Sequence, residues 1–504
     1  MFFSKSKQAV VAWLPVHAGE WYQFLLTCIL LFLISTTYNV LRPLKVTIMI
    51  SAPHSGAEII PFLKVWGILP GALFFSFLYA QLSKYMSREG VFYTIVGIFI
   101  CFFTLFFSVL FPFRNELEFT SVDTLCETWV PAAKWLLAMV RHWHLSLFYI
   151  CSELWGSVVL SMLFWGFINE ISTTDQAKRF YGLFLLGGNT GAIAAGLFGN
   201  SFSTQDFDSA LPFGATGWEQ SVYFIVGIAI ICQVAVLVLF RLLSTRPAIR
   251  QMAKEDKEPS KKIAPFTLRK AFVTLYRSPH LRYITCIVIC YNFVFNLIDV
   301  MFTDQLHIHF GNDSGALNAF MSRVTIANGL IATFIALFVS GNLLRRFGWR
   351  STALTTPIVV TISCIGFFGI LLFRDSIITQ GLVFFFACPV TLLAVYLGGI
   401  QLCLTRGLKY TLFDATKEMA FIPLSPKEQR QGKAVIDGVA SRFGKSGGSF
   451  FYQFLLLFLP SIAATLPYVG ILILVIIILW VYAVLGLTRS LQSKLREKGE
   501  QAVI

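Results

Sequence analysis

Two pairs of basic residues interrupt apolar stretches of this sequence with the same spacing. Arg42 and Lys45 lie in "YNVLRPLKVTIMI", and Arg442 and Lys445 lie in "ASRFGKSGGSFFYQ". Residues at positions i and i+3 project from one face of a helix, so each pair presents two cations together. An uncompensated charge near the centre of a bilayer costs at least about 2.5 kcal/mol. Four cations at that depth indicate a water-filled cavity, partner anions, or a bound polyanionic solute.

The alternative is that these side chains reach the lipid headgroups from helix ends. For Arg42 and Lys45 this would hold if the first apolar span ended close to them. The run "VTIMI" after Lys45 makes the apolar stretch too long for one straight span, and Pro43 lies between the two cations. Both features favour a broken or tilted helix, the kind that lines the sites of carriers.

Two acidic residues also lie in or near apolar stretches of the sequence. Glu153 lies in "CSELWGSVVLS" and Asp299 lies in "NLIDV". A buried carboxylate can pair with a cation while a site is empty, or take up a proton that moves with the substrate; the alternative is an acid at a helix end in water. We expect the substrate-binding residues to be Arg42, Lys45, Glu153, Asp299, Arg442 and Lys445.

The tripeptide Gly444-Lys445-Ser446 has the look of a nucleotide-hydrolysing P-loop. Such a loop needs a glycine at position 439, where Val439 stands, and a preceding strand. We therefore expect no P-loop. An enzyme acting on phosphorylated lipids would also need intramembrane cations, but the sequence shows neither an acidic metal pair nor a nucleophile with its base. We expect no enzyme, no metal site and no cofactor.

The composition is that of a membrane protein. Of 504 residues, 56% are hydrophobic and 13% are charged, and the mean hydropathy is +0.72; soluble domains carry roughly 25% charged residues. Runs of about 20 apolar residues cross a bilayer as helices. We predict an all-α membrane protein with twelve transmembrane helices, near 21–41, 61–82, 91–112, 145–168, 180–200, 221–243, 282–302, 321–341, 352–373, 379–402, 434–460 and 466–487.

The distribution of charge predicts the topology. If both termini are cytoplasmic, inside segments hold 30 of the 40 Lys and Arg residues, as the positive-inside rule requires. The net charge of +14 then reflects topology and attraction to anionic lipid, and we expect no nucleic-acid partner. The longest hydrophilic segment divides the chain into a six-helix bundle (1–243), a cytoplasmic basic linker (244–280), a second six-helix bundle (281–488) and a cytoplasmic tail (489–504). This plan is major-facilitator-like.

Four longer motifs resemble one known family. "SELWGSVVLSMLFWGFINEI", "AKRFYGLF", "YTLFDATKEMAFIPL" and "GKAVIDGVASRFGKSGGS" closely resemble the ATP/ADP translocase family of nucleotide transporters of plastids and obligate intracellular bacteria such as chlamydiae and rickettsiae. The likeness runs from about residue 13 to about residue 490. It implies a carrier in the bacterial inner membrane that exchanges nucleotides, most typically ATP for ADP, by alternating access. It leaves the oligomeric state open.

The resemblance also implies roles for single residues. The functionally important lysine of "LRxxK", glutamate of "ELWGS", acid of "NLxEV" and lysine of "GKSGG" fall on Lys45, Glu153, Asp299 and Lys445. The chain departs from the pattern after "NLIDV", where the usual tryptophan and lysine are replaced by Phe302 and Thr303, and at Val46, where an acid is usual. Proton-coupled uptake, or a carrier for GTP, UTP or NAD, therefore remains the alternative.

Overall fold

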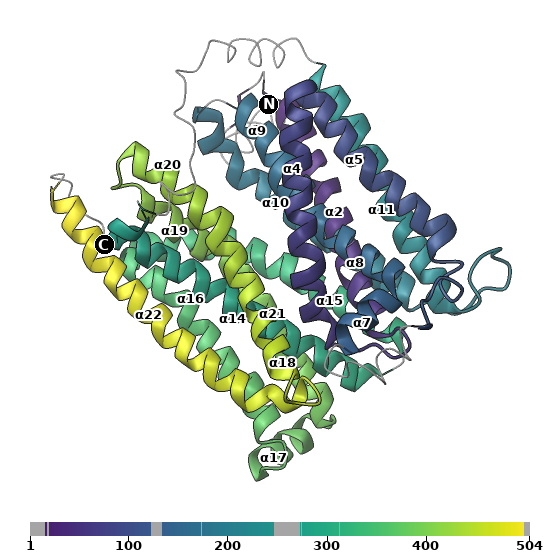
Figure 1. Ribbon diagram of the computed structural model, residues 1–504. Helices are drawn as coiled ribbons and strands as arrows, with labels where there is room; N and C mark the ends of the chain where they lie inside the picture. Colours follow the sequence, from purple (N-terminus) through teal and green to yellow (C-terminus); the bar gives the residue numbers. More distant parts are fainter. Residues whose placement is uncertain are drawn as a thin grey trace, which may run out of the picture.

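The structure is a computed structural model that describes residues 16–17, 20–121, 134–172, 174–245, 273, 275–311 and 313–497. All secondary-structure elements of the described residues are helices (Figure 1). Most of the predicted linker 244–280 and the end of the predicted tail lie outside the described residues. A short helix, α7 (Lys134–Arg141), follows the gap at 122–133.

The first half of the chain supplies six long helical segments. They are α2 (Trp21–Ile50); α3 (Ile59–Phe62), η1 (Leu63–Ile68) and α4 (Leu69–Tyr85) in succession; α5 (Arg88–Leu105) with η2 (Phe106–Leu110); α8 (Trp143–Trp155), η4 (Gly156–Phe164) and α9 (Trp165–Ile171) in succession; α10 (Thr174–Ser203); and α11 (Gly217–Ser244). The η1, η2 and η4 segments are π-helical turns, which widen a helix locally.

The second half supplies a similar set. Its elements are α14 (Pro279–Phe310); α15 (Ser314–Phe334) with η5 (Ile335–Val339); α16 (Ser340–Leu372), which turns sharply at Gly348; α17 (Ile377–Phe386); α18 (Val390–Leu408), η6 (Lys409–Phe413) and α19 (Asp414–Phe421) in succession; α20 (Pro426–Val435), η7 (Ile436–Ala440) and α21 (Ser441–Leu456) in succession; η8 (Ala463–Thr465); and α22 (Leu466–Glu497). The all-α membrane fold predicted from composition is confirmed.

Eleven helical segments of the described chain are long and apolar enough to cross a membrane, against twelve predicted. The segment missing from the eleven is the predicted span 434–460. It is helical over Pro426–Leu456, but Arg442, Lys445 and several glycines and serines lower its apolarity. The number twelve therefore stays a prediction.

The predicted span 379–402 was wrong at its start. The chain forms the short helix α17, breaks at Ala387, which has a positive φ of 48°, and begins the long helix α18 only at Val390. Pro389 precedes α18 directly, and proline cannot donate the backbone hydrogen bond that would continue α17. The apolar composition runs through this break, which is why hydropathy alone did not reveal it.

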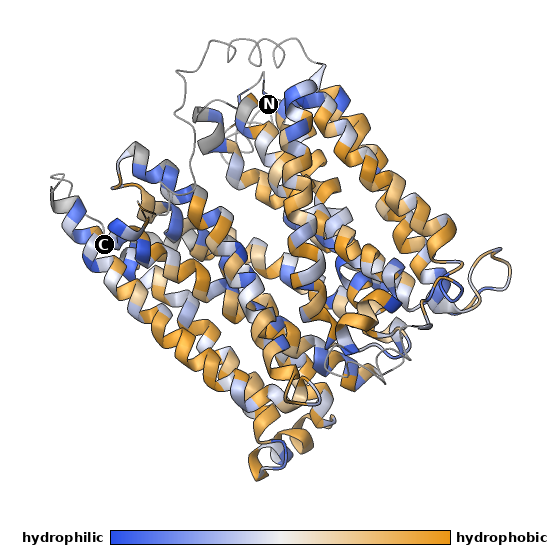
Figure 2. Cartoon of the chain, in the orientation of Figure 1, coloured by the Kyte–Doolittle hydropathy of each residue, from blue (hydrophilic) through white to orange (hydrophobic). Residues whose placement is uncertain are grey.

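The helices form two bundles that lie side by side (Figure 1). The described chain begins and ends at the same face of the molecule, which we call the terminal face; the other we call the opposite face. Figure 2 shows hydrophobic residues along the middle of the helices and hydrophilic residues gathered toward both faces. This banding is the pattern expected of helices that cross a bilayer.

The two bundles touch along two lines of helices. On one side, α15 packs against α2, α10 and α11; on the other, α21 packs against α3 and η1. Polar bonds join the bundles near the opposite face: the side-chain amide of Gln453 donates to the Pro61 carbonyl at 2.9 Å, and the Trp66 indole donates to the Gln453 amide oxygen at 3.2 Å. Thr47 and Asn318 form a further bond at 3.4 Å. The bundles are therefore closed together toward the opposite face.

The helix α2 continues through Pro43 without a break, so of the two predicted alternatives the broken helix is excluded and the tilted helix stays a prediction. Its start is held to α10 by Glu20, which accepts two hydrogen bonds from the Arg179 guanidinium at 2.8 and 2.9 Å. These bonds hold the pKa of the Glu20 carboxyl at about 2, well below its ordinary value of 4.5. The ion pair thus stays formed across the physiological pH range and aligns α2 with α10.

Helix α10 approaches its neighbours at glycine positions. A β-carbon added at Gly196 would lie 2.7 Å from the Ser322 carbonyl oxygen of α15, and one at Gly191 would lie 2.5 Å from the Phe32 carbonyl oxygen of α2. At Gly188 the nearest atom would be 3.8 Å away, in the Leu31 side chain. Glycine at these positions lets the backbones approach closely, and α10 thereby links α2 to α15.

Substitution of Gly196 by alanine is expected to destabilise the protein, because the backbone oxygen of Ser322 cannot move aside as a flexible side chain could. Overpacking of this kind costs roughly 1–3 kcal/mol. The matched control is Gly188→Ala, which meets only ordinary contacts and is expected to be neutral or slightly stabilising. The thermal unfolding midpoints of the two purified variants measure the difference. Equal midpoints would show that α10 and α15 can move apart to accept the added methyl group without loss of stability.

Candidate functional site

The first ion pair of the site joins α2 to α8. The Lys45 ammonium donates to Glu153 Oε2, and it also lies 4.5 Å from the centroid of the Tyr149 ring. The Lys45 side chain is only 4% exposed, whereas Glu153 is 35% exposed. Lys45 therefore does not extend to the headgroups, and α2 continues past it to Ile50.

The motif around Glu153 holds α8 against α2 at three successive levels. Below the ion pair, the fully buried Trp155 indole donates to the Ile34 carbonyl at 3.0 Å. At Gly156 a β-carbon would lie 2.6 Å from the Tyr38 ring, so only glycine leaves room for that ring. The residues flanking Glu153 thus hold its carboxylate at a defined position on the inner wall of the first bundle.

The second bundle brings Lys445 toward the same carboxylate. Lys445 and Arg42 both act electrostatically on Glu153, in addition to its bonded partner Lys45. The Lys445 side chain is exposed, whereas Gly444 is buried on the face of α21 that packs on α14. Cations of both bundles therefore act on one carboxylate of the first bundle.

Asp299 forms the second centre of charge. Its two carboxylate oxygens have different partners: Oδ2 accepts from the Lys64 ammonium at 2.9 Å, and Oδ1 accepts from the Arg406 guanidinium at 3.1 Å. Arg406 also lies 5.2 Å from the centroid of the Phe295 ring. Lys45 acts electrostatically on this site as well, since Asp299 contributes to its surroundings. The Lys45 ammonium thus interacts electrostatically with both carboxylates, Glu153 and Asp299.

Arg442 is the one predicted residue that this network does not include. It is partly buried, one turn before Lys445 on α21. Within the described chain, no hydrogen bond, ion pair or ring contact is recorded for the Arg442 side chain. The structure therefore brings together Arg42, Lys45, Glu153, Asp299 and Lys445, and leaves Arg442 beside them.

The network lies near the middle of the membrane-crossing helices. Glu153, Asp299 and Lys445 are ten or eleven residues from the ends of α8, α14 and α21 at the opposite face. At about 1.5 Å per residue this is roughly 15 Å, half the thickness of a bilayer core of about 30 Å. At such depth the exposed fractions of the Glu153 and Asp299 side chains, 35% and 24%, indicate that these side chains border an open space rather than packed helix.

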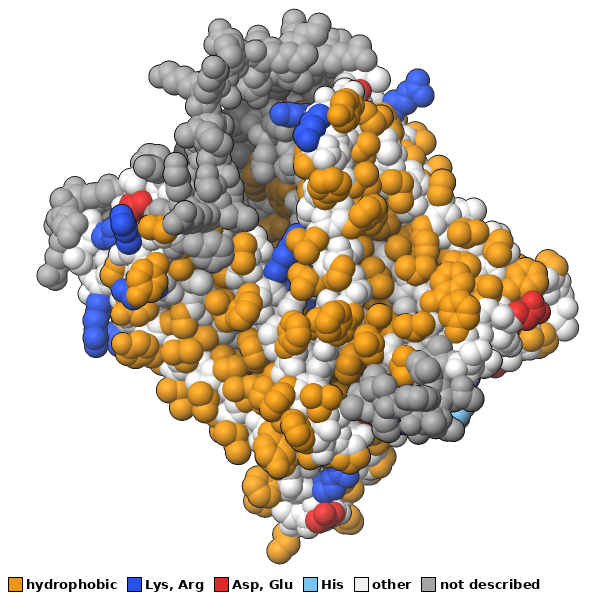
Figure 3. Space-filling view, in the orientation of Figure 1, with side chains coloured by type: hydrophobic (Ala, Val, Ile, Leu, Met, Phe, Trp, Pro, Cys, Tyr) orange, Lys and Arg blue, Asp and Glu red, His pale blue; other side chains and the backbone are white. Residues whose placement is uncertain are grey.

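Figure 3 shows where that space opens. The surface is hollowed between the two bundles on the side of the terminal face, and Lys or Arg side chains lie in the wall of the hollow. Toward the opposite face the bundles are closed by the bonds of Gln453 and Asn318. A hollow with basic side chains in its wall thus lies between the bundles on the side of the terminal face, and we call this hollow the cleft.

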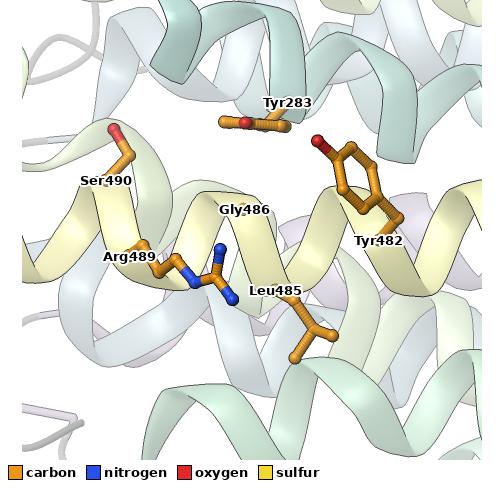
Figure 4. A pocket seen from close by; sticks show the side chains of 6 residues that line it. All are labelled: Tyr283, Tyr482, Leu485, Gly486, Arg489 and Ser490. Carbon is orange, nitrogen blue, oxygen red and sulfur yellow. The ribbon is translucent and has the colours of Figure 1, made fainter.

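A separate pocket lies on the lateral surface of the second bundle. Tyr283 of α14 faces Tyr482, Leu485, Gly486, Arg489 and Ser490 of α22 across it (Figure 4). Its volume is about 360 Å³, but none of the charged residues described above lines it. This lateral pocket therefore shares no lining residue with the charged network.

Comparison with known proteins identifies the family. The family model described as TLC ATP/ADP transporter matches residues 3–491. The chain belongs to this family. It is 38% identical over 472 residues to ADP,ATP carrier protein 1 of Chlamydia trachomatis serovar D, covering 92% of this chain and 88% of that one. It is 37% identical over 465 residues to the plastidic ATP/ADP-transporter of Solanum tuberosum, covering 92% of this chain and 71% of that one.

The solved structures that this TLC family chain resembles confirm the major-facilitator-like fold. A bacterial homologue of the iron transporter ferroportin in an inward-facing state has a TM-score of 0.55 at 14% identity, over 92% of this chain and 98% of that one. The nucleoside transporter NupG has a TM-score of 0.54 at 13% identity, over 92% and 99%. At such low identity these likenesses concern the fold alone.

Two residues of the charged network were missed by the sequence analysis. Lys64 lies inside the predicted span 61–82 but was not considered, and Arg406 was counted with the cytoplasmic segment that follows the predicted span 379–402. The structure has these helices begin at Ile59 and continue past Arg406 to Phe421, so both residues lie within them. A cation inside an apolar span was the available signal for Lys64, whereas the misplaced end of the span 379–402 concealed Arg406.

Wide π-turns mark the helices that carry the site. Lys64 lies in η1; η4 begins three residues after Glu153, and η6 begins three residues after Arg406. Before Lys445, η7 interrupts the helix that leads into α21. Such turns are frequent at functional sites. Here they lie in or next to the segments that carry Lys64, Glu153, Arg406 and Lys445.

Proposed function

We propose that this protein is a nucleotide carrier of the ATP/ADP exchange type. The observation that supports this most directly is the convergence of cations from both bundles on Glu153: Lys45 from the first and Lys445 from the second. A polyphosphate supplies the negative charge that such a cluster lacks. The relatives named ADP,ATP carrier and plastidic ATP/ADP-transporter support adenine nucleotides as the substrate.

In the mechanism we propose, the Glu153 and Asp299 carboxylates pair with the cations of the site when no phosphate is bound. In the loaded carrier, Arg42, Lys45, Arg442 and Lys445 contact the phosphate groups. In the empty carrier, Glu153 and Asp299 neutralise the cations, so that rearrangement of the empty carrier requires ion pairs at mid-depth to separate. This cost is absent when a nucleotide replaces the carboxylates. The arrangement therefore favours obligatory exchange of one nucleotide for another.

We further propose that the protein resides in the inner membrane of an intracellular bacterium, with both termini in the cytoplasm. The excess of basic residues at the terminal face of the chain supports this orientation. The cleft open toward the terminal face then corresponds to an inward-facing state. A transporter that works in this way needs no catalytic group, and we propose that the protein has no enzymatic activity.

Uptake into reconstituted vesicles tests this function. Labelled ATP, ADP, GTP, UTP and NAD are offered separately, with and without unlabelled nucleotide inside. We expect rapid uptake of ATP and ADP, dependent on internal ATP or ADP, and little uptake of the others. If uptake does not depend on internal nucleotide and is abolished by a protonophore, the protein is a proton-coupled transporter and not an exchanger. If GTP, UTP or NAD is taken up in preference to ATP and ADP, the proposed substrate is wrong.

A further inference from the structure

The ion pair between Lys64 and Asp299 joins the two bundles. Lys64 lies in η1 of the first bundle, and Asp299 lies in α14 of the second. The second partner of Asp299, Arg406 of α18, belongs to the same bundle as Asp299. One carboxylate is therefore shared between a cation of its own bundle and a cation of the other.

The position of this bridge relates it to the closed end of the cleft. Lys64 lies between Pro61 and Trp66, which both bond to Gln453 of α21 across the interface. The side chains of Lys64, Asp299 and Arg406 are 16%, 24% and 14% exposed, so the bridge is partly shielded from water. On its other side, Asp299 acts on Lys45 and so borders the cation cluster. The bridge lies at the boundary between the closed interface and the cleft.

We infer that the Lys64–Asp299 bridge is a latch that holds the opposite face closed in the empty carrier, and that a phosphate group of the bound nucleotide releases it by pairing with Lys64. The inference rests on the proposed function. Separation of the bundles without a substrate would leave Lys64 at mid-depth without an anion, which is costly. With a phosphate on Lys64, Asp299 keeps Arg406 as its partner. Every charge of the bridge then has a counter-charge in both states.

Distances across the opposite face test the latch. Asn115 and Asp375 are exposed, lie on different bundles, and follow the ends of η2 and α16 at that face. Spin labels on Asn115→Cys and Asp375→Cys, in an otherwise cysteine-free protein in nanodiscs, report the separation of the bundles. Without nucleotide we expect a single short distance, and with ATP a second, longer one. Adenosine, which has no phosphate, is expected to leave the short distance unchanged.

Removal of the latch is expected to mimic the effect of ATP. In Lys64→Gln and in Asp299→Asn, the ratio of long to short distances without nucleotide should rise at least tenfold over that of the wild type. Lys64→Arg keeps a cation at the bridge and should retain the short distance. The matched control is Arg406→Gln, which removes the partner within one bundle and leaves the link between bundles, so its distances should resemble those of the wild type.

The possible failures are distinguishable. If Lys64→Gln and Asp299→Asn are folded, as judged by size-exclusion chromatography, and still show only the short distance, the latch does not exist, whatever the vesicles transport. If those variants open but ATP does not lengthen the distance in the wild type, release by phosphate is wrong. If wild-type vesicles carry no nucleotide at all, the proposed function fails independently of any distance.

Discussion

Replacement of Lys445 by glutamine is expected to reduce nucleotide exchange roughly 100-fold and to leave the protein folded. Lys445 is exposed on α21 and acts on Glu153 across the interface between the bundles, so its ammonium can contact a phosphate from the second bundle. A hydrogen bond to a charged group is worth about 1.5–3 kcal/mol, and this alone corresponds to a loss of about 10- to 150-fold. The initial rate of labelled ATP uptake into ADP-loaded vesicles measures it.

The control for this variant is Lys84→Gln. Lys84 lies in the last turn of α4 and donates to the Gln81 side chain at 3.0 Å, far along the chain from any member of the cluster. Lys84→Gln also removes one positive charge from the protein, but its initial rate of ATP uptake should equal that of the wild type. Normal exchange kinetics in Lys445→Gln, at matched protein levels in the vesicles, would contradict the phosphate contact proposed for this residue.

Replacement of Glu153 by glutamine is expected to have the largest effect on stability. The Lys45 side chain is 4% exposed, and the substitution would remove the carboxylate to which its ammonium is bonded. Removal of one partner from a buried ion pair costs about 3–5 kcal/mol. We therefore expect a lower thermal unfolding midpoint together with loss of exchange. Unfolding is followed in detergent by the fluorescence of a thiol-reactive dye or by calorimetry.

The double variant Lys45→Gln/Glu153→Gln separates the two effects. With both charges removed, no unpaired ion is buried, so much of the lost stability should return, whereas exchange should remain absent because the phosphate contact is gone. Thermal midpoints of the two single variants and the double variant form a cycle that measures the coupling between the two residues. Additive effects of the two substitutions on stability would rule out the ion pair as the cause.

The two halves of the described chain have two structural features in common. Asn39 of α2 and Asn292 of α14 each donate a side-chain hydrogen bond to the carbonyl four residues earlier, at 2.8 Å in both cases. The Gly-rich helices α10 and α21 each pack closely on the first long helix of their own half. The first long helix and the Gly-rich helix are thus related in the same way in both halves.

The sequence by itself determined the class of the protein and most of its charged site. Apolar runs of membrane length have no stable alternative to helices in lipid, and charges inside such runs are too costly to be accidental, so composition and spacing were sufficient to select Lys45, Glu153, Asp299 and Lys445. The motifs around them identified the family before any geometry was known.

Only the tertiary structure decided how these charges are shared. Pairing depends on which helices adjoin and on where each helix begins, and hydropathy locates helix ends only to within several residues. The inclusion of Lys64 and Arg406, the bridge across the bundles at Asp299, and the unbroken course of α2 through Pro43 all depend on such details. Contacts between residues more than a hundred positions apart are set by packing, and the local sequence around each residue contains no record of its partner.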